Sequence, residues 1–148
     1  MKMMTSLKLA AALFSTVAVA STAMAQESSY KPGTVWEASR IDVLPGQFEN
    51  YMDYLAANWK KVQEFGKAQG VVVSYHVLAT NNARAGEPDL VLVVQYKDYM
   101  TTAQQEAARK KVNEMLAQTD RSAATSSGER TKMRESMGST EYQELILK

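Results

Sequence analysis

Residues 70–80, GVVVSYHVLAT, and residues 90–99, LVLVVQYKDY, contain the two apolar runs that decide the fold. Each run has the length and the β-branched and aromatic composition of a β-strand. The connector between them, NNARAGEPD at 81–89, carries Asn, Gly and Pro where a turn needs them. Two strands joined in this way predict a β-hairpin with a longer loop.

The segment before the hairpin predicts a strand and then a helix. Residues 34–43, TVWEASRIDV, are rich in strand-forming side chains. The helix expected over residues 47–69 presents one continuous apolar stripe, made of Phe48, Met52, Leu55, Trp59 and Val62. Gly70 closes this helix in the manner of a left-handed cap.

The segment after the hairpin predicts a second helix and a last strand. Thr102 and Gln105 form an expected capping box, and the helix that it opens points Ala108, Val112, Met115 and Leu116 inward. Residues 119–128, TDRSAATSSG, are expected to be a polar, mobile segment, and residues 129–137 a short helix that Gly138 closes. Residues 141–147, EYQELIL, predict the final strand.

The resulting order, β-α-β-β-α-β, predicts an α+β protein of the ferredoxin-like type with a four-stranded antiparallel sheet. Both helices then cover one face of the sheet, and the other face should alternate apolar and polar residues if it meets water. The hairpin strands are instead apolar on both faces. Each side chain removed from water contributes about 1.5–3 kcal/mol. We therefore expect a two-fold homodimer whose sheets pack together as a barrel.

Three blocks of the sequence carry a family resemblance: residues 54–78, YLAANWKKVQEFGKAQGVVVSYHVL; residues 89–99, DLVLVVQYKDY; and residues 128–148, GERTKMRESMGSTEYQELILK. Together they resemble a group of uncharacterised exported bacterial proteins of the dimeric α+β-barrel superfamily. The resemblance implies the fold and dimerisation, and it assigns no functional residues. The wider superfamily includes cofactor-free monooxygenases, haem-degrading enzymes, muconolactone isomerases and stress-responsive proteins, so this fold does not determine a function.

The N-terminus has the features of a bacterial signal peptide. Lys2 and Lys8 precede or border an apolar run at 9–20 that is too short to span a membrane, and Ala23-Met24-Ala25 has the form of a signal-peptidase site. We expect residues 1–25 to be removed after Ala25, residues 26–33 to form a flexible lead-in, and residues 34–148 to form one domain. The mature protein is expected in the periplasm or secreted, without a membrane anchor.

Composition excludes several classes of function. Without Lys2 and Lys8 the mature chain has 15 basic and 16 acidic residues, a net charge of −1, which argues against nucleic-acid binding. The chain contains no cysteine, which excludes disulfides, thiolate metal sites and a cysteine nucleophile. No cluster of metal-ligating side chains is found in the sequence, so neither a metal nor a cofactor is expected.

Strand alternation nominates the candidate site. On the second strand, Val71, Val73, Tyr75 and Val77 are expected to meet the helices, and Val72, Ser74, His76 and Leu78 the barrel interior. The first strand fits either orientation, and taking Ile41 and Val43 as core places its Trp36 and Arg40 inside. The candidate ligand-binding residues are therefore Trp36, Arg40, Ser74, His76 and Gln95. Sparse polar groups in an apolar wall are typical of small-molecule pockets. The other interpretation is that these groups satisfy one another across the dimer interface.

Three functions remain open at this stage. The favoured one is a protein that binds a small hydrophobic molecule in the barrel without converting it. The second is a cofactor-independent monooxygenase or isomerase in which His76, the only histidine, or Arg40 stabilises an anionic intermediate. The third is a structural protein that acts only through partners. No acidic residue adjoins His76 in the sequence to orient it, and no catalytic residue is assigned.

Overall fold

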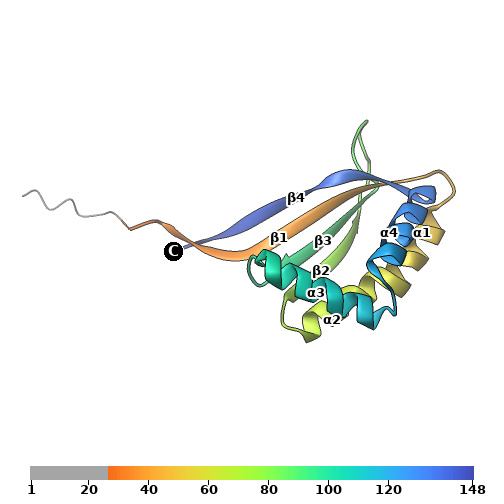
Figure 1. Ribbon diagram of the computed structural model, residues 1–148. Coiled ribbons are helices and arrows are strands. Elements are labelled where there is room, and N and C mark those ends of the chain that lie inside the picture. The colour runs from red at the N-terminus through yellow and green to blue at the C-terminus, as the bar shows by residue number, and fades with distance from the viewer. Residues whose placement is uncertain (1–26) are drawn as a thin grey trace, which may run out of the picture.

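The computed structural model describes residues 27–148, so the expected signal peptide and its cleavage site lie outside the described residues. The elements in chain order are β1 (Tyr30–Val43), α1 (Phe48–Tyr54), η1 (Leu55–Trp59), α2 (Lys60–Ala68), β2 (Val72–Ala79), β3 (Leu90–Tyr96), α3 (Thr102–Met115), α4 (Asp120–Glu129), η2 (Arg130–Lys132) and β4 (Arg134–Leu147). The four strands form one antiparallel sheet in the order β2-β3-β1-β4 (Figure 1). The predicted α+β class and sheet are confirmed, with one additional helix, α4.

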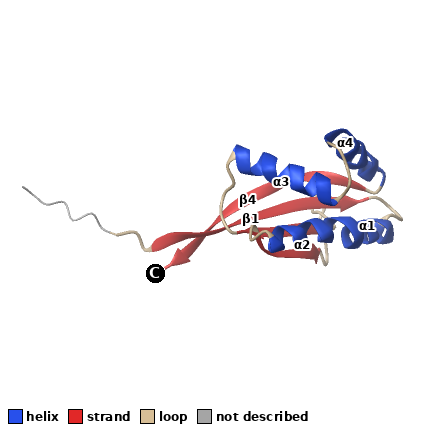
Figure 2. Ribbon diagram, turned by 60° about the horizontal axis from the view of Figure 1, so that its bottom comes forward, coloured by secondary structure: helices blue, strands red, loops and turns tan. Residues whose placement is uncertain are grey.

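All the helices lie on the same face of the sheet, which we call the helix face, and the opposite face is bare (Figures 1 and 2). We call this bare side the open face. The core lies between the helix face and the first helical segment and consists of Ile41, Tyr51, Leu55, Leu90 and Leu92. None of the helices formed by residues 27–148 is both long and apolar enough to cross a membrane.

The first helical segment is continuous but contains a π-helical turn, η1, between α1 and α2. A π turn accommodates one more residue than an α-helical turn and rotates the face that follows it. The buried positions are therefore Tyr51, Leu55 and Gln63, whereas Phe48 of the predicted stripe is 45% exposed. Ideal helical periodicity could not predict Gln63 as a buried residue, because the rotation places it where Val62 was expected.

Strand β2 contains a bulge that shifts its alternation. Val72 is the partner of Tyr96, and Ser74 is the partner of the preceding residue, Gln95, so that Val73 is an extra residue on β2. The predicted faces are consequently wrong at this point, because Val72 is 8% exposed and lies in the core, whereas Val73 is 46% exposed. A bulge inserts one unpaired residue and thereby exchanges the two faces of a strand.

The predictions for the segment after α3 were wrong in three respects. Residues 119–128, expected to be mobile, form most of α4, and Thr119 caps this helix together with Ser122. The helix expected over 129–137 is only the short turn η2, because β4 already begins at Arg134. Gly138, expected to end that helix, has a φ of +94° and lies where the pairing of β4 with β1 shifts.

Two element boundaries also differ from the prediction. The capping box of α3 consists of Thr101 and Gln104, one residue earlier than the predicted pair. Strand β1 begins at Tyr30, where it pairs with Leu147, so residues 30–33 belong to a strand and not to the expected lead-in. The ends of β1 and β4 project from the body of the protein as a two-stranded ribbon (Figure 1).

Ala117, which follows the C-terminus of α3, has a φ of +49°. This left-handed conformation is unfavourable for residues with a Cβ atom and free of that penalty for glycine. We expect Ala117→Gly to increase the free energy of unfolding by about 0.5–1 kcal/mol, after allowance for the greater freedom of glycine in the unfolded chain. Urea denaturation measures this change.

The matched control is Ala107→Gly, in the interior of α3. There glycine should lower stability by about 1 kcal/mol, since its helix propensity is lower than that of alanine. Equal destabilisation by both substitutions would show that Ala117 does not carry the inferred strain.

Candidate functional site

The strand pairing places the five predicted site residues on the open face. Trp36 pairs with Gln95, which in turn faces Ser74 across the neighbouring strand. The next residue of β3 on this face is Val93, which pairs with Ala38 of β1 and His76 of β2. The one after it is Val91, which pairs with Arg40 of β1 and Leu78 of β2. The open face therefore combines the polar residues predicted for the site with apolar residues, and it is lined by all four strands.

A chain of hydrogen bonds crosses the open face from β2 to β4. Ser74 Oγ donates to Gln95 Oε1 at 2.7 Å, and Gln95 Nε2 donates to Thr34 Oγ1 at 2.9 Å. Thr34 Oγ1 donates in turn to Glu144 Oε2 at 2.6 Å. Ser74 and Gln95 thus have partners within one protomer, which agrees with the interpretation that the polar groups of this face satisfy one another.

Glu144 is the acceptor at the end of this chain. Hydrogen bonds from the Thr34 hydroxyl and from the Thr34 backbone N–H, the latter at 3.0 Å, hold the pKa of this carboxyl below its usual range. Sequence reasoning missed Thr34 and Glu144 as members of the network. Their meeting depends on the pairing of β1 with β4, two strands separated by about a hundred residues, and no local pattern shows that register.

We expect Thr34→Val to raise the pKa of Glu144 toward its unfolded value, because the hydroxyl donor is lost while the branched shape is kept. The lowered pKa makes a stabilising contribution that is present above the unfolded pKa of Glu144 and is lost as the pH falls through the folded pKa. The substitution should therefore reduce this acid-sensitive part of stability. NMR titration of the Glu144 carboxyl carbon measures the pKa directly.

Ser39→Ala provides the control, since Ser39 lies on the same strand but its hydroxyl bonds to Ser139 at 2.8 Å. It should leave the titration of Glu144 unchanged. An unaltered Glu144 pKa in Thr34→Val would show that the hydroxyl does not hold this carboxylate.

The other predicted site residues are less constrained. His76 is exposed, and its ring makes no hydrogen bond to any residue between 27 and 148. Trp36 is half-buried. Arg40 Nη2 donates to the carbonyl of Gly86 in the β2–β3 loop at 3.2 Å, and it borders a hollow of about 410 Å³ that Glu87 and Tyr142 also line. Trp36 lies close enough to Glu144 to help lower the pKa of that carboxyl, whereas no hydrogen bond within residues 27–148 joins His76 or Arg40 to Ser74, Gln95, Thr34 or Glu144.

A cavity of about 380 Å³ lies on the other side of the sheet, between α2, α3 and the adjoining ends of β2 and β3. We call it the helix-side cavity. Its volume falls in the range of small-molecule sites. Most of its wall is apolar, and its larger apolar residues are Val62, Phe65, Val71, Val72, Met100 and Val112. Sequence analysis did not identify this cavity.

Gln63 is the polar residue buried in the wall of the helix-side cavity. It is only 8% exposed and is the one buried polar side chain of the described chain. Its amide makes no side-chain hydrogen bond within residues 27–148, and neither of its polar atoms is sealed from the cavity. Since these atoms stay accessible, the amide can donate to or accept from a polar group of a molecule in the cavity.

Tyr96 and Lys111 are the other notable polar contributors. Tyr96 lines the cavity, and its hydroxyl donates to Glu37 Oε2 at 3.3 Å. Burial, followed by the nearby negative charge of Glu37, raises the pKa of Tyr96, so the phenol stays protonated. Lys111 donates to Gln69 Oε1 at 3.2 Å across the gap between α3 and α2.

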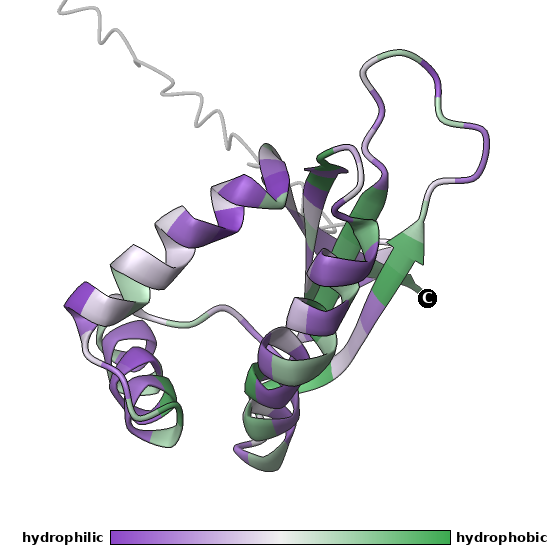
Figure 3. Ribbon diagram, turned by 90° about the vertical axis from the view of Figure 1, so that its right-hand side faces the viewer, coloured by the Kyte–Doolittle hydropathy of each residue, from purple (hydrophilic) through white to green (hydrophobic). Residues whose placement is uncertain are grey.

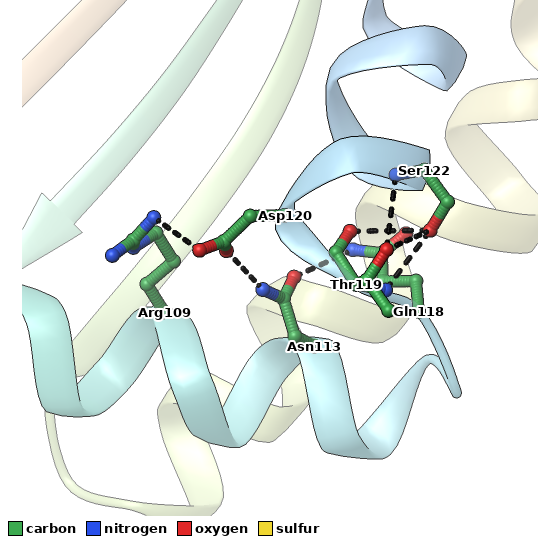
Figure 4. Close-up of polar contacts among 6 residues, drawn as sticks. All are labelled: Arg109, Asn113, Gln118, Thr119, Asp120 and Ser122. Carbon is green, nitrogen blue, oxygen red and sulfur yellow. Dashed lines mark hydrogen bonds and ion pairs between the residues drawn. The ribbon is translucent and has the colours of Figure 1, made fainter.

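A group of polar side chains, which we call the polar corner, lies between α3 and α4 (Figure 4). Asp120 forms an ion pair with Arg109 at 2.9 Å and accepts a hydrogen bond from Asn113 Nδ2 at 2.7 Å. Gln118 Nε2 then donates to Asn113 Oδ1 at 3.0 Å. Neither α3 nor α4 contains a fully buried residue, and Figure 3 shows hydrophilic residues dominating both helices, in contrast with the strands.

Residues 27–148 contain no group of three histidine, aspartate or glutamate side chains arranged to hold a metal ion. No protein-family model matches the sequence, and no curated protein matches it. Two solved structures are similar in fold. Protein SO0527 from Shewanella oneidensis is 15% identical with a TM-score of 0.49, and the match covers 79% of this chain and 98% of that one. A candidate monooxygenase from Shewanella loihica PV-4 is 14% identical with a TM-score of 0.40, covering 78% and 94%.

Proposed function

We propose that this protein binds a small, mainly apolar molecule in the helix-side cavity. The observation that carries the proposal is the combination of an apolar space of about 380 Å³ with the amide of Gln63 in its wall, which makes no side-chain hydrogen bond within residues 27–148. Apolar walls supply affinity through burial, and a single polar group fixes the orientation of the ligand. Tyr96 adds a second hydrogen-bonding group that stays neutral.

The open face, where the sequence placed the ligand, is the weaker candidate within one protomer. Ser74 and Gln95 already have partners, so they are not left waiting for a ligand. The hollow beside Arg40 has polar or charged walls at Arg40, Thr80, Glu87 and Thr140. Catalysis at His76 or Arg40 gains no support either, because within residues 27–148 neither side chain forms an ion pair or hydrogen bond with an acidic group that would activate or orient it.

We expect Ala108→Phe to abolish binding of N-phenyl-1-naphthylamine, a neutral fluorophore whose emission rises in apolar sites. Ala108 lines the helix-side cavity, and a phenyl ring would occupy much of that space. The wild-type protein should bind the fluorophore with micromolar affinity and saturate at one molecule per cavity. Fluorescence titration measures both quantities.

Ala124→Phe is the matched control, because Ala124 is exposed on α4 and lines none of the cavities described above. It should bind as the wild type does. Circular dichroism and thermal unfolding of both variants separate a filled cavity from a damaged fold. Absence of saturable binding to the wild type, or full binding by a folded Ala108→Phe protein, would contradict the proposal.

We further propose that the open faces of two copies pack together, which gives the dimeric barrel implied by the family resemblance. In the isolated protomer this face leaves Leu78 52% exposed, and Tyr142 of β4, the partner of Trp36, is 54% exposed. Apolar side chains grouped on one face of a sheet favour association through that face. The export to the periplasm that the N-terminal sequence predicts remains part of the proposal.

Leu78→Lys should convert a dimer into a monomer. The substitution places one lysine on each of the two apposed faces, and dimerisation would have to remove both charges from water. Phe48→Lys is the control: Phe48 is also exposed and apolar, but it lies on α1, away from the open face. Sedimentation equilibrium at micromolar concentration measures the masses. A monomeric wild-type protein would refute the dimer.

A further inference from the structure

A second cavity, of about 250 Å³, adjoins the helix-side cavity. The two cavities have Val62 of α2 and Val112 of α3 in common as lining residues, so they are neighbouring parts of one groove between these helices. Leu116 extends the apolar wall into the second cavity. The groove is thus apolar along its middle and changes in character where it reaches α4.

Polar and cationic groups line the α4 end of the groove. Asn58, Gln118 and Arg130 contribute amide and guanidinium groups to the second cavity. The guanidinium of Arg130 lies 5.2 Å from the ring centre of Tyr54, which lines the same cavity. This stacking, together with hydrogen bonds from Arg130 to Ser126 and Ser127, fixes the position of the charge. We call this the cationic end.

The positive charge at the cationic end is not neutralised within the described part of the chain. No carboxylate of residues 27–148 lies within ion-pair distance of Arg130 or of nearby Arg134. Nε of Arg134 is buried and has no hydrogen-bond partner among these residues. Both guanidinium groups lie close enough to Tyr51 for their charges to favour its ionised form, although burial outweighs them. Two cations without acidic partners create a potential that favours an anion.

We propose that the ligand is an amphipathic anion, with a carboxylate head at Arg130 and an apolar tail that runs between Val62 and Val112 into the helix-side cavity. This inference rests on the proposed function and adds the chemical class and the orientation of the ligand. A guanidinium binds a carboxylate through two parallel hydrogen bonds, and the side-chain amides of Asn58 and Gln118 can donate further ones. Gln63, beside the tail, would select chains that carry one additional polar group.

Competition with N-phenyl-1-naphthylamine tests the proposal, with octanoate and 1-octanol as the probes at pH 7. Transfer from water alone favours the neutral alcohol, so preference for the acid requires recognition of its charge. In the wild-type protein octanoate should displace the fluorophore at about tenfold lower concentration than octanol. Arg130→Gln should remove this preference, with the affinity for the neutral fluorophore unchanged.

Lys111→Gln is the matched control, because it removes a positive charge from the opposite part of the groove. It should retain the preference for octanoate. Octanoate labelled with ¹³C at its carboxyl gives a second measurement: bound to the wild type its pKa should fall below the value in water, and bound to Arg130→Gln it should not.

The outcomes separate the two proposals. Failure of the wild type to bind the neutral fluorophore refutes the proposed function. Binding of the fluorophore without a preference for octanoate leaves the apolar site intact and refutes the amphipathic anion. Loss of the preference in Lys111→Gln, with its retention in Arg130→Gln, refutes the assignment of the head group to Arg130.

Discussion

The groove between the helices depends on how little of α3 is buried. Its side chains toward α2 include the small residues Ala107 and Ala108, and none of its residues is fully buried. A helix that buries a broad apolar stripe is drawn onto its sheet until the side chains interlock. The side chains that join α3 to α4 are instead polar and exposed, in the corner built around Asp120 and Asn113. The space that this arrangement leaves is the helix-side cavity.

The opposite wall of the groove is held much more tightly. A Cβ atom added at Gly66 would lie 2.6 Å from Cγ2 of Val72, so α2 reaches β2 at a distance that only glycine allows. Trp59 reinforces this wall by packing edge-on against Tyr75, with ring centres 5.4 Å apart. The groove therefore has one rigid wall, made by α2 and the sheet, and one wall with few anchoring contacts, made by α3.

The sequence predicted β2 and β3 well because both are short, strongly apolar and separated by clear turn residues. It predicted only parts of β1 and β4, which are 14 residues long and carry many polar side chains. Two local irregularities, one in a helix and one in a strand, change which side chains share a face. The π turn at 55–59 buries Gln63, and the bulge at Val73 moves Val72 into the core. Neither irregularity leaves a periodic signal in the sequence. The sequence did not predict the cationic end, because residues 119–128 have the small, polar composition of a linker. In the structure they form a helix that Thr119 and Ser122 cap.

Both edges of the sheet carry an irregularity, at Val73 on β2 and near Gly138 on β4. A regular edge strand presents a row of unpaired N–H and C=O groups to which another strand can add, and a bulge interrupts that row. Lateral growth of the sheet into a filament is thereby discouraged in a protein whose apolar strands would otherwise be prone to aggregate. These bulges do not obstruct contact between copies through the sheet faces. Two identical faces that meet about a two-fold axis form a closed dimer, to which no third subunit can add through the same face.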